Sequence, residues 1–309
     1  MLLTVLVFGA AGFVGRNLVK KLAEEHHNVV ASDVIDDPFN GSIVYRKVDI
    51  LDGNRVLEAV KKTDVIVHLA ASPLAVSLQD PARNVKVNLE GTLNILDAAR
   101  KNDVSKVIYS SASSVVGSVR SNPVDENHTC EPKTPYAVAK KACEEYLRVY
   151  NELYGLRYLV FRFFNVYGPW QTYGSGALIP VMYRNLTEGK EIQVYGDGSN
   201  TRDFVYVGDV TDFCSAAITS HTENSVVNMG TGKGTSIIEL INLASDLLGT
   251  KPKIAYRPAR PGEISNFVAD TAKLVQVFGR GPSTSLKEGL KRTFSWLAAH
   301  DRHEIADAR

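Results

Sequence analysis

Three glycines close to the N-terminus constrain the fold of this chain more than any other feature. Residues 3–8 form a short apolar run, and Gly9, Gly12 and Gly15 follow it directly. Residues 13–25 then show the apolar spacing of an amphipathic helix. A glycine-rich turn between a strand and a helix lets the backbone approach a pyrophosphate, at a helix N-terminus where N–H groups lack partners. The pattern therefore predicts a dinucleotide-binding site.

An acidic residue ends the next strand-like run. Residues 28–33 close with Asp33, at the distance from the glycines that is expected for the carboxylate that binds the adenosine ribose. Such a carboxylate accepts hydrogen bonds from both ribose hydroxyls and repels a 2′-phosphate. Residues 34–37 include neither Arg nor Lys, so NAD is favoured over NADP. The competing interpretation, that the glycines serve only a tight turn, leaves the position of Asp33 unexplained.

The first half of the chain continues as an alternation of two patterns. Strand-like runs occur at residues 28–33, 43–48, 64–68, 106–110 and 157–163, with helical patterns such as 88–101 between them. This alternation predicts an α/β fold, with a Rossmann-type doubly wound parallel sheet covered by helices on both faces. The nearly continuous apolar character of residues 65–67 and 158–163 agrees, because inner parallel strands are buried on both sides.

The second half has a looser rhythm. Gly and Pro become frequent after about residue 165, and helical patterns return near residues 207–220, 236–248 and 286–299. We interpret this part as a smaller α/β C-terminal lobe for the substrate. The expected division is residues 1–165 plus about 203–230 for the NAD-binding domain, and residues 166–202 plus about 231–309 for the substrate lobe.

The overall composition excludes several other classes of protein. The net charge is +1, so no strong field attracts nucleic acid or an anionic membrane. The chain has three cysteines, Cys130, Cys143 and Cys214, without the spacing of a zinc site or a disulfide framework. No apolar stretch reaches 18 residues, and the N-terminus lacks a basic region. We therefore expect a cytoplasmic protein with no metal, no nucleic-acid partner and no membrane partner.

Tyr136 and Lys140 form the candidate catalytic pair. They lie four residues apart in a helical pattern that extends to about residue 154, so they share one face of that helix. A neighbouring ammonium and a positive nicotinamide ring would both lower the pKa of the phenol from its usual value near 10. Tyr136 could then act as a general base on a sugar hydroxyl. Alone, this spacing is common by chance, and the upstream glycine motif makes it meaningful.

The order of these motifs, with others, resembles the extended short-chain dehydrogenase/reductases, in particular the nucleotide-sugar epimerase/dehydratase group that includes UDP-sugar 4-epimerases. The resemblance covers nearly the whole chain. Besides the glycines, Tyr136 and Lys140, its motifs are Asp49-Ile50, His68-Leu69-Ala70-Ala71, Asn88-Leu89-Glu90-Gly91-Thr92, Arg162-Phe163-Phe164-Asn165-Val166-Tyr167-Gly168-Pro169, Gly196-Asp197-Gly198 with Arg202-Asp203-Phe204, and Arg260-Pro261-Gly262-Glu263.

The resemblance implies further site residues and a homodimer. The cofactor would contact four groups of residues: the glycine turn, the residues around its adenine, the segment after the fourth strand and the residues that frame its nicotinamide. In this chain they include Phe13, Val14, Asp49, Ile50, Leu69, Ala70, Ala71, Phe163 and Val166. Asn165, Arg202 and Arg260 would hold the diphosphate of a nucleotide sugar, and Glu263 would lie near the nucleotide ribose. Helices at residues 88–99 and 137–150 would pair with their copies, although burial within one chain could also explain their apolar positions.

The segment after the fifth strand separates the chemistries within this group. The 4,6-dehydratases of the group carry residues like Thr-Asp-Glu at three positions. In this chain the three positions are Ala112, Ser113 and Ser114. Because dehydration and decarboxylation use acids there, their absence favours 4-epimerisation, which needs a base and a bound hydride carrier. The catalytic hydroxyl of the family falls on Ala112, so Ser111 is the candidate to supply it and Ser113 is a candidate substrate ligand, with their roles open to exchange.

Two alternatives remain beside epimerisation. One is a dehydratase or reductase of the same group that takes an acid from elsewhere in the chain. The other, of a different class, is a catalytically weak NAD-sensing or scaffold protein. Ala112 favours this alternative, whereas the retained Tyr136 and Lys140 argue against it.

Overall fold

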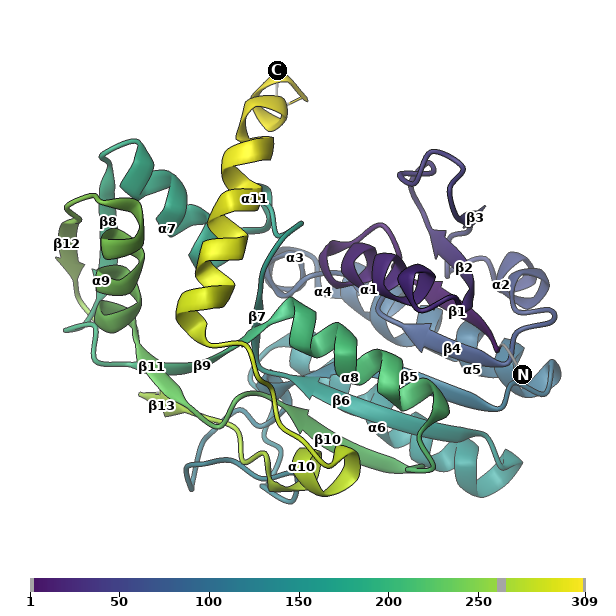
Figure 1. Ribbon diagram of the computed structural model, residues 1–309. Helices are drawn as coiled ribbons and strands as arrows, with labels where there is room; N and C mark the ends of the chain where they lie inside the picture. Colours follow the sequence, from purple (N-terminus) through teal and green to yellow (C-terminus); the bar gives the residue numbers. More distant parts are fainter. Residues whose placement is uncertain (1–2, 260–264, 308–309) are drawn as a thin grey trace.

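A seven-stranded parallel sheet forms the centre of the molecule in the computed structural model, which describes residues 3–259 and 265–307, the last seven of these as backbone only (Figure 1). The strand order is β10-β6-β5-β4-β1-β2-β3, with bounds Thr4–Phe8 (β1), Asn28–Asp33 (β2), Val44–Lys47 (β3), Val65–His68 (β4), Lys106–Ala112 (β5), Arg157–Phe163 (β6) and Ser225–Met229 (β10). The order reverses between β1 and β4. In such sheets ligands bind at this reversal, beyond the carboxyl ends of the strands.

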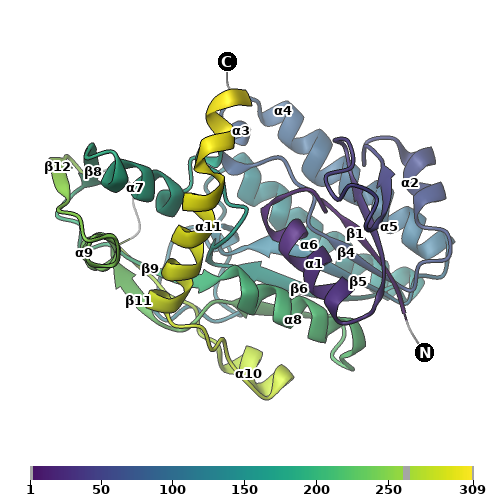
Figure 2. The same ribbon diagram turned by 45° about the horizontal axis from the view of Figure 1, so that its top comes forward.

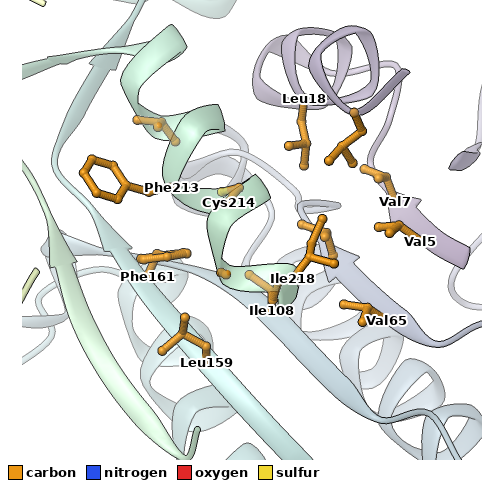
Figure 3. Packing of buried hydrophobic residues seen from close by; sticks show 14 of the residues in the cluster. Val5, Val7, Leu18, Val65, Ile108, Leu159, Phe161, Phe213, Cys214 and Ile218 are labelled. Carbon is orange, nitrogen blue, oxygen red and sulfur yellow. The ribbon is translucent and has the colours of Figure 1, made fainter. Parts of the chain in front are cut away.

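Helices cover both faces of the sheet, as the sequence predicts. One face carries α1 (Phe13–Glu24), α8 (Val207–Thr219) and α10 (Ala272–Phe278). Figure 3 shows Leu18 of α1 and Phe213 of α8 packed over sheet residues such as Val65 and Leu159. The other face carries α2 (Gly53–Ala59), α5 (Gly91–Lys101) and α6 (Pro135–Tyr154), which bury a second apolar cluster. The Rossmann-type fold class predicted from the sequence is confirmed.

Short helical segments link β4 to α5. They are α3 (Leu74–Gln79), α4 (Pro81–Asn84) and the π-helix η1 (Val85–Glu90), which leads directly into α5. The sequence predicted one helix from residue 88, whereas the helical backbone begins earlier and changes its hydrogen-bonding pattern on the way. A π-helical turn is rare and often marks a functional site. Here η1 lies beside the cavity described below.

The remaining elements gather at one end of the large sheet (Figures 1 and 2). A smaller four-stranded sheet contains β7 (Asn165–Tyr167), β9 (Thr201–Tyr206), β11 (Gly234–Ser236) and β13 (Asn266–Phe267), and β8 (Glu191–Tyr195) pairs with β12 (Lys253–Arg257). Helices α7 (Leu178–Thr187), α9 (Ile237–Leu248) and α11 (Leu286–Asp307) enclose a third apolar cluster with these strands. After β9 the chain returns to the large sheet through α8 and β10.

Two single-turn 3-10 helices complete the chain, η2 (Ser113–Val115) after β5 and η3 (Tyr173–Ser175) before α7. The sequence expected β5 to end at residue 110, but the strand continues to Ala112. It also expected α11 to end at 299, whereas the helix continues to Asp307. In the part of the chain that the structure describes, no helix combines the length and the apolarity that crossing a membrane requires.

Candidate active site

The glycine turn leaves no room for side chains. Gly9 has a φ of 81°, and a Cβ atom there would lie 2.5 Å from the backbone N of Ala70. A Cβ on Gly15 would lie 2.1 Å from the Gly9 carbonyl oxygen. The three glycines thus let the β1–α1 turn press against both the start of α1 and the end of β4. This is the close backbone approach that a dinucleotide site requires.

A cavity of about 870 Å³ extends from this turn across the ends of β1, β2 and β4. Gly9, Gly12, Asp33, Asp49, Ile50, Leu69, Ala70 and Ala71 all line it, so eight of the predicted cofactor residues come together here. Its size matches the cavities that hold cofactors and other small molecules. Glycines that exclude side chains, an acid at the end of β2 and this volume together fit an NAD molecule.

The Asp33 carboxylate already has two backbone partners. Its Oδ2 accepts a hydrogen bond from the Ala11 N–H at 2.9 Å, and its Oδ1 accepts one from the Val34 N–H at 2.8 Å. Each carboxylate oxygen has a second acceptor site, so both remain able to accept from ribose hydroxyls. Asp33 therefore fixes the glycine turn and faces the cavity at the same time.

Two cations on the opposite wall were not predicted from the sequence. Arg83 of α4 and Lys86 of η1 line the 870 Å³ cavity beside Val87. The segment from residue 80 to 87 has no motif that marks it, and the packing of α4 and η1 against α6 accompanies the placement of these side chains at the cavity. They supply positive charge for a ligand that carries a diphosphate.

A second cavity of about 300 Å³ holds the candidate catalytic pair. Tyr136 and Lys140 line it together with the glycine turn and the end of β5, and it shares Gly9, Gly12, Leu69 and Ala71 with the first cavity. The predicted residues Phe13, Val14, Gly15, Ser111 and Phe163 line it too. Val166 is the one predicted cofactor residue outside both cavities; its side chain packs between the clusters of the two sheets.

Helix α6 is positioned by its first turn. Thr134 caps it, accepting a hydrogen bond from the Ala137 N–H, and Pro135 occupies the first helical position, where a missing N–H costs nothing. Tyr136 therefore lies in the first turn and Lys140 one turn later. The Lys140 Nζ donates a hydrogen bond of 2.6 Å to the Ser110 carbonyl oxygen and lies 4.7 Å from the centre of the Tyr109 ring.

The electrostatics of the pair differ from the expectation. Burial raises the pKa of Tyr136 to about 12 in the chain without a cofactor, and the lowered phenol pKa, which also depends on the positive nicotinamide ring, stays a prediction. Burial lowers the pKa of Lys140 to about 8, while Cys143 and Glu144 act in the opposite direction. The Lys140 Nζ lies 5.7 Å from the centre of the Tyr136 ring and points to Ser110 instead. Desolvation of the phenol outweighs this distant cation.

The serines after β5 have different environments. The Ser111 Oγ is buried and donates a hydrogen bond of 2.6 Å to Glu144 Oε1, although Ser111 also lines the cavity that holds Tyr136. Ser113 begins η2 and is also buried. Ala112 also lines the cavity that holds Tyr136. Ser114, which the sequence analysis left without a role, has a buried Oγ that makes no hydrogen bond in the described part of the chain.

The candidate substrate residues are partly described. The Asn165 amide donates to the Asp203 carbonyl oxygen at 3.1 Å, and Arg202 Nη1 donates to the Thr201 carbonyl oxygen at 2.8 Å. Asp203 is fully buried and accepts hydrogen bonds from Thr231, Gly232 and Ala269, which fixes β9 where Arg202 emerges. Arg260 and Glu263 lie outside the described residues.

Comparison with known proteins now identifies the group. The sequence model of the NAD dependent epimerase/dehydratase family matches residues 5–230, which includes both cavities. The chain belongs to this family. A putative UDP-glucose 4-epimerase from Methanocaldococcus jannaschii is 35% identical over 307 residues, a match that covers 96% of this chain and 99% of the relative.

Solved structures of family members agree in fold over nearly the whole chain. The UDP-glucose 4-epimerase of Thermotoga maritima, solved with UDP-glucose, is 33% identical with a TM-score of 0.91, covering 96% of this chain and 99% of that one. The enzyme of the same name from Thermus thermophilus, solved as a complex with NAD, is 32% identical with a TM-score of 0.88 and the same coverage. The family predicted from the sequence, and NAD as its cofactor, are confirmed.

Proposed function

We propose that this chain catalyses the NAD-dependent 4-epimerisation of a UDP sugar through a transient 4-keto sugar. One observation carries the choice of reaction. Among the described residues that line the catalytic cavity there is no Asp or Glu, although Tyr136 and Lys140 are both present. Loss of water from a sugar needs an acid beside the base, whereas epimerisation needs only a base and a hydride carrier.

NAD, Tyr136 and Lys140 each have a task in this reaction. When bound, NAD supplies the acceptor and the donor of the hydride at C4. Tyr136 takes the 4-hydroxyl proton and later returns it. Because the pKa of Tyr136 is about 12 without a positive ring nearby, we expect its deprotonation to depend on the oxidised nicotinamide. Lys140 holds the Ser110 carbonyl and adds positive charge beneath the phenol.

The substrate class rests on the relatives and on the smaller lobe. Structures of similar proteins were solved with UDP-glucose and with UDP-glucuronic acid. We propose that Asn165, Arg202 and Arg260 bind the diphosphate, since guanidinium groups match phosphate oxygens, and that Glu263 binds near the nucleotide ribose. With Ser111 held by Glu144, Ser113 is the serine we propose to contact the sugar, and the unpartnered Ser114 hydroxyl lies next to it.

We further propose the domain division, the assembly and the location of the enzyme. Residues 1–165 with about 203–230 would bind NAD, and residues 166–202 with about 231–309 would bind the nucleotide sugar. A stripe of apolar residues runs along the outer face of α6, at spacings of three and four: Val138, Ala142, Tyr146, Val149 and Leu153. Val138 and Leu153 are 54% and 66% exposed, which supports a homodimer built on this helix. We place the enzyme in the cytoplasm.

The test is incubation of the purified protein with UDP-galactose, UDP-N-acetylgalactosamine and UDP-glucuronate in turn, followed by NMR of the anomeric protons. Appearance of the 4-epimer, lost in Tyr136→Phe, is the expected result. A 4-keto or unsaturated sugar would identify a dehydratase. NAD binding without any change in the three sugars would identify the sensor or scaffold protein, which the alanine at position 112 favours.

A further inference from the structure

A buried ion pair lies one turn beyond the catalytic pair on the same helix. Arg162 of β6 donates to Glu144 of α6 through two nitrogens, Nε to Oε1 at 3.0 Å and Nη2 to Oε2 at 2.8 Å. Both side chains are at least 95% buried. Arg162 Nη1 also donates to the carbonyl oxygen of Glu126, in the loop before α6, at 3.1 Å. The Ser111 hydroxyl of β5 completes the group at 2.6 Å from Glu144 Oε1.

This group joins the elements that frame the catalytic cavity. Ser111 and Arg162 are direct neighbours in the parallel ladder between β5 and β6, so Glu144 spans two strands at one level. Tyr136, Lys140 and Glu144 follow at intervals of four, on one face of α6. The Lys140 Nζ donates a hydrogen bond to the carbonyl oxygen of Ser110, the residue directly before Ser111. Adjacent positions of β5 therefore hold adjacent turns of α6.

Stability alone is a weak explanation for such a group. Removing a carboxylate and a guanidinium from water costs several kcal/mol each, and a well-packed apolar pair of similar volume often gives equal or greater stability. A bidentate pair does fix orientation, because the planar guanidinium accepts a carboxylate in one geometry. An apolar contact at this level would let α6 slide or rotate over β5 and β6 with little penalty.

We propose that Glu144, Arg162 and Ser111 form a positioning device that sets the height and rotation of α6, so that Lys140 reaches the Ser110 carbonyl and Tyr136 faces the cavity. The proposal rests on the proposed function for its effect on turnover. Its effect on Lys140 can be measured without any turnover. Under this assignment Ser111 acts through Glu144 rather than on the sugar.

The charge of Glu144 also bears on Lys140. The ionisable groups that face Lys140 are Cys143 and Glu144 on its own helix, His68 of β4, Tyr109 of β5 and Tyr136. Burial lowers the pKa of His68 to about 3, so this ring is neutral. Glu144 is thus the group among them that carries negative charge at neutral pH. Its loss would lower the pKa of Lys140 and leave the Arg162 cation unpaired nearby, which acts in the same direction.

The variants are Glu144→Gln, Arg162→Lys and Ser111→Ala, with Asp209→Asn as matched control. Asp209 of α8 is also a buried carboxylate, bonded to the backbone of Ser283 and Thr284, and lies in neither cavity. Each protein is labelled with lysine carrying ¹³C at Cε, and the Lys140 signal, assigned with Lys140→Arg, is followed against pH in the NAD-bound protein. Melting temperature, kcat and KM are measured beside it.

We expect Glu144→Gln to lower the pH midpoint of Lys140 and to reduce kcat by about 10- to 100-fold with little change in KM. Arg162→Lys keeps the positive charge but loses the bidentate contact with Glu144, so kcat should fall while the pH midpoint of Lys140 changes less. Ser111→Ala, the mildest variant, should show a smaller loss of the same kind, and Asp209→Asn should lower only the melting temperature.

Unchanged Lys140 midpoints and unchanged kcat in folded Glu144→Gln and Ser111→Ala proteins would overturn the proposal. So would kcat losses in all four variants that simply follow their melting temperatures. If the Lys140 midpoint also moves in Arg162→Lys and Ser111→Ala, which keep the Glu144 carboxylate, but no UDP sugar is converted by the wild type, the positioning role stands and the proposed function fails.

Discussion

The Nζ of Lys140 lies 5.7 Å from the centre of the Tyr136 ring, yet its hydrogen bond goes to the carbonyl oxygen of Ser110. The two members of the proposed catalytic pair are therefore neighbours on α6 with different polar contacts. Burial acts on both, raising the pKa of Tyr136 to about 12 and lowering that of Lys140 to about 8. Each of these shifts has a measurable consequence.

The stability of the enzyme should depend on Lys140 at alkaline pH. Burial lowers the folded-state pKa of Lys140 to about 8, below the ordinary value of 10.5, so between these values the unfolded chain binds more protons than the folded one. Stability from this group therefore rises with pH across that window. Relative to Lys140→Met, the wild type should gain about 3 kcal/mol in free energy of unfolding between pH 8 and 10.5. Urea titrations at several pH values measure this, and a constant difference would contradict the burial of a charged Lys140.

Ala112→Ser should accelerate the enzyme. Ala112 lines the catalytic cavity beside Tyr136, and a hydroxyl there would give the proton a donor and acceptor within the site. Positioned proton-transfer groups contribute about 10²–10⁴-fold, so we expect kcat to rise at least about tenfold. Steady-state rates with UDP-galactose test this, with Ala139→Ser on the same helix as Tyr136, outside both cavities, as control. A kcat of Ala112→Ser equal to or lower than that of the wild type would show that another group already transfers the proton.

Gly9→Ala should abolish tight NAD binding. Position 9 has a φ of 81°, and its new Cβ would meet backbone atoms of Leu69 and Ala70 within 2.8 Å. Gly155→Ala is a matched control, since Gly155 has a φ of 70° but open space around it. The control should lose about 1 kcal/mol of stability and keep its cofactor. Calorimetric titration with NAD distinguishes them, and equal affinities would remove the glycine turn from the binding site.

Asp33→Asn should reduce the preference for NAD over NADP. The asparagine keeps an oxygen for the Ala11 N–H but removes the negative charge that would repel a 2′-phosphate. We expect the ratio of the two dissociation constants to shift by at least about tenfold, equivalent to about 1.4 kcal/mol. Calorimetry with both dinucleotides measures the ratio. If it stays constant, discrimination comes from another wall of the cavity, where Arg83 and Lys86 lie.

Val138→Asp should halve the mass of the particle in solution. Val138 is 54% exposed and belongs to the apolar stripe on the outer face of α6. A carboxylate on each copy would meet its symmetric partner and separate the two. Light scattering after gel filtration measures the mass, with Val275→Asp on α10, which is 44% exposed, as control. A wild-type protein that is already monomeric would refute the dimer.

The sequence predicted what depends on local spacing. Strand and helix periodicity identified the large sheet, and β2 and β6 have the predicted bounds. Gly9, Asp33, Tyr136 and Lys140 line two adjoining cavities, because Gly9 follows a strand, Asp33 ends one, and Tyr136 and Lys140 lie in the first two turns of a helix at the same edge of the sheet.

What the sequence did not predict depends on contacts between distant segments. Nothing near Ser111 shows that its hydroxyl is taken by Glu144, 33 residues later. The raised pKa of Tyr136 is a property of the packed site, since it comes from burial rather than from its neighbour at position 140. Arg83 of α4 and Lys86 of η1 line the cavity because of the path that the chain takes between β4 and α5, which apolar periodicity does not reveal.

Helix α6 presents chemistry on one side and an apolar surface on the other. Val138 lies between Tyr136 and Lys140 in the sequence, and its side chain is turned outward while theirs line the cavity. A helix about 10 Å across separates solvent from the cavity that Tyr136 and Lys140 line. A partner that binds to this outer stripe would therefore contact the helix that carries both Tyr136 and Lys140. In a homodimer joined there, only the two α6 helices would lie between the two cavities.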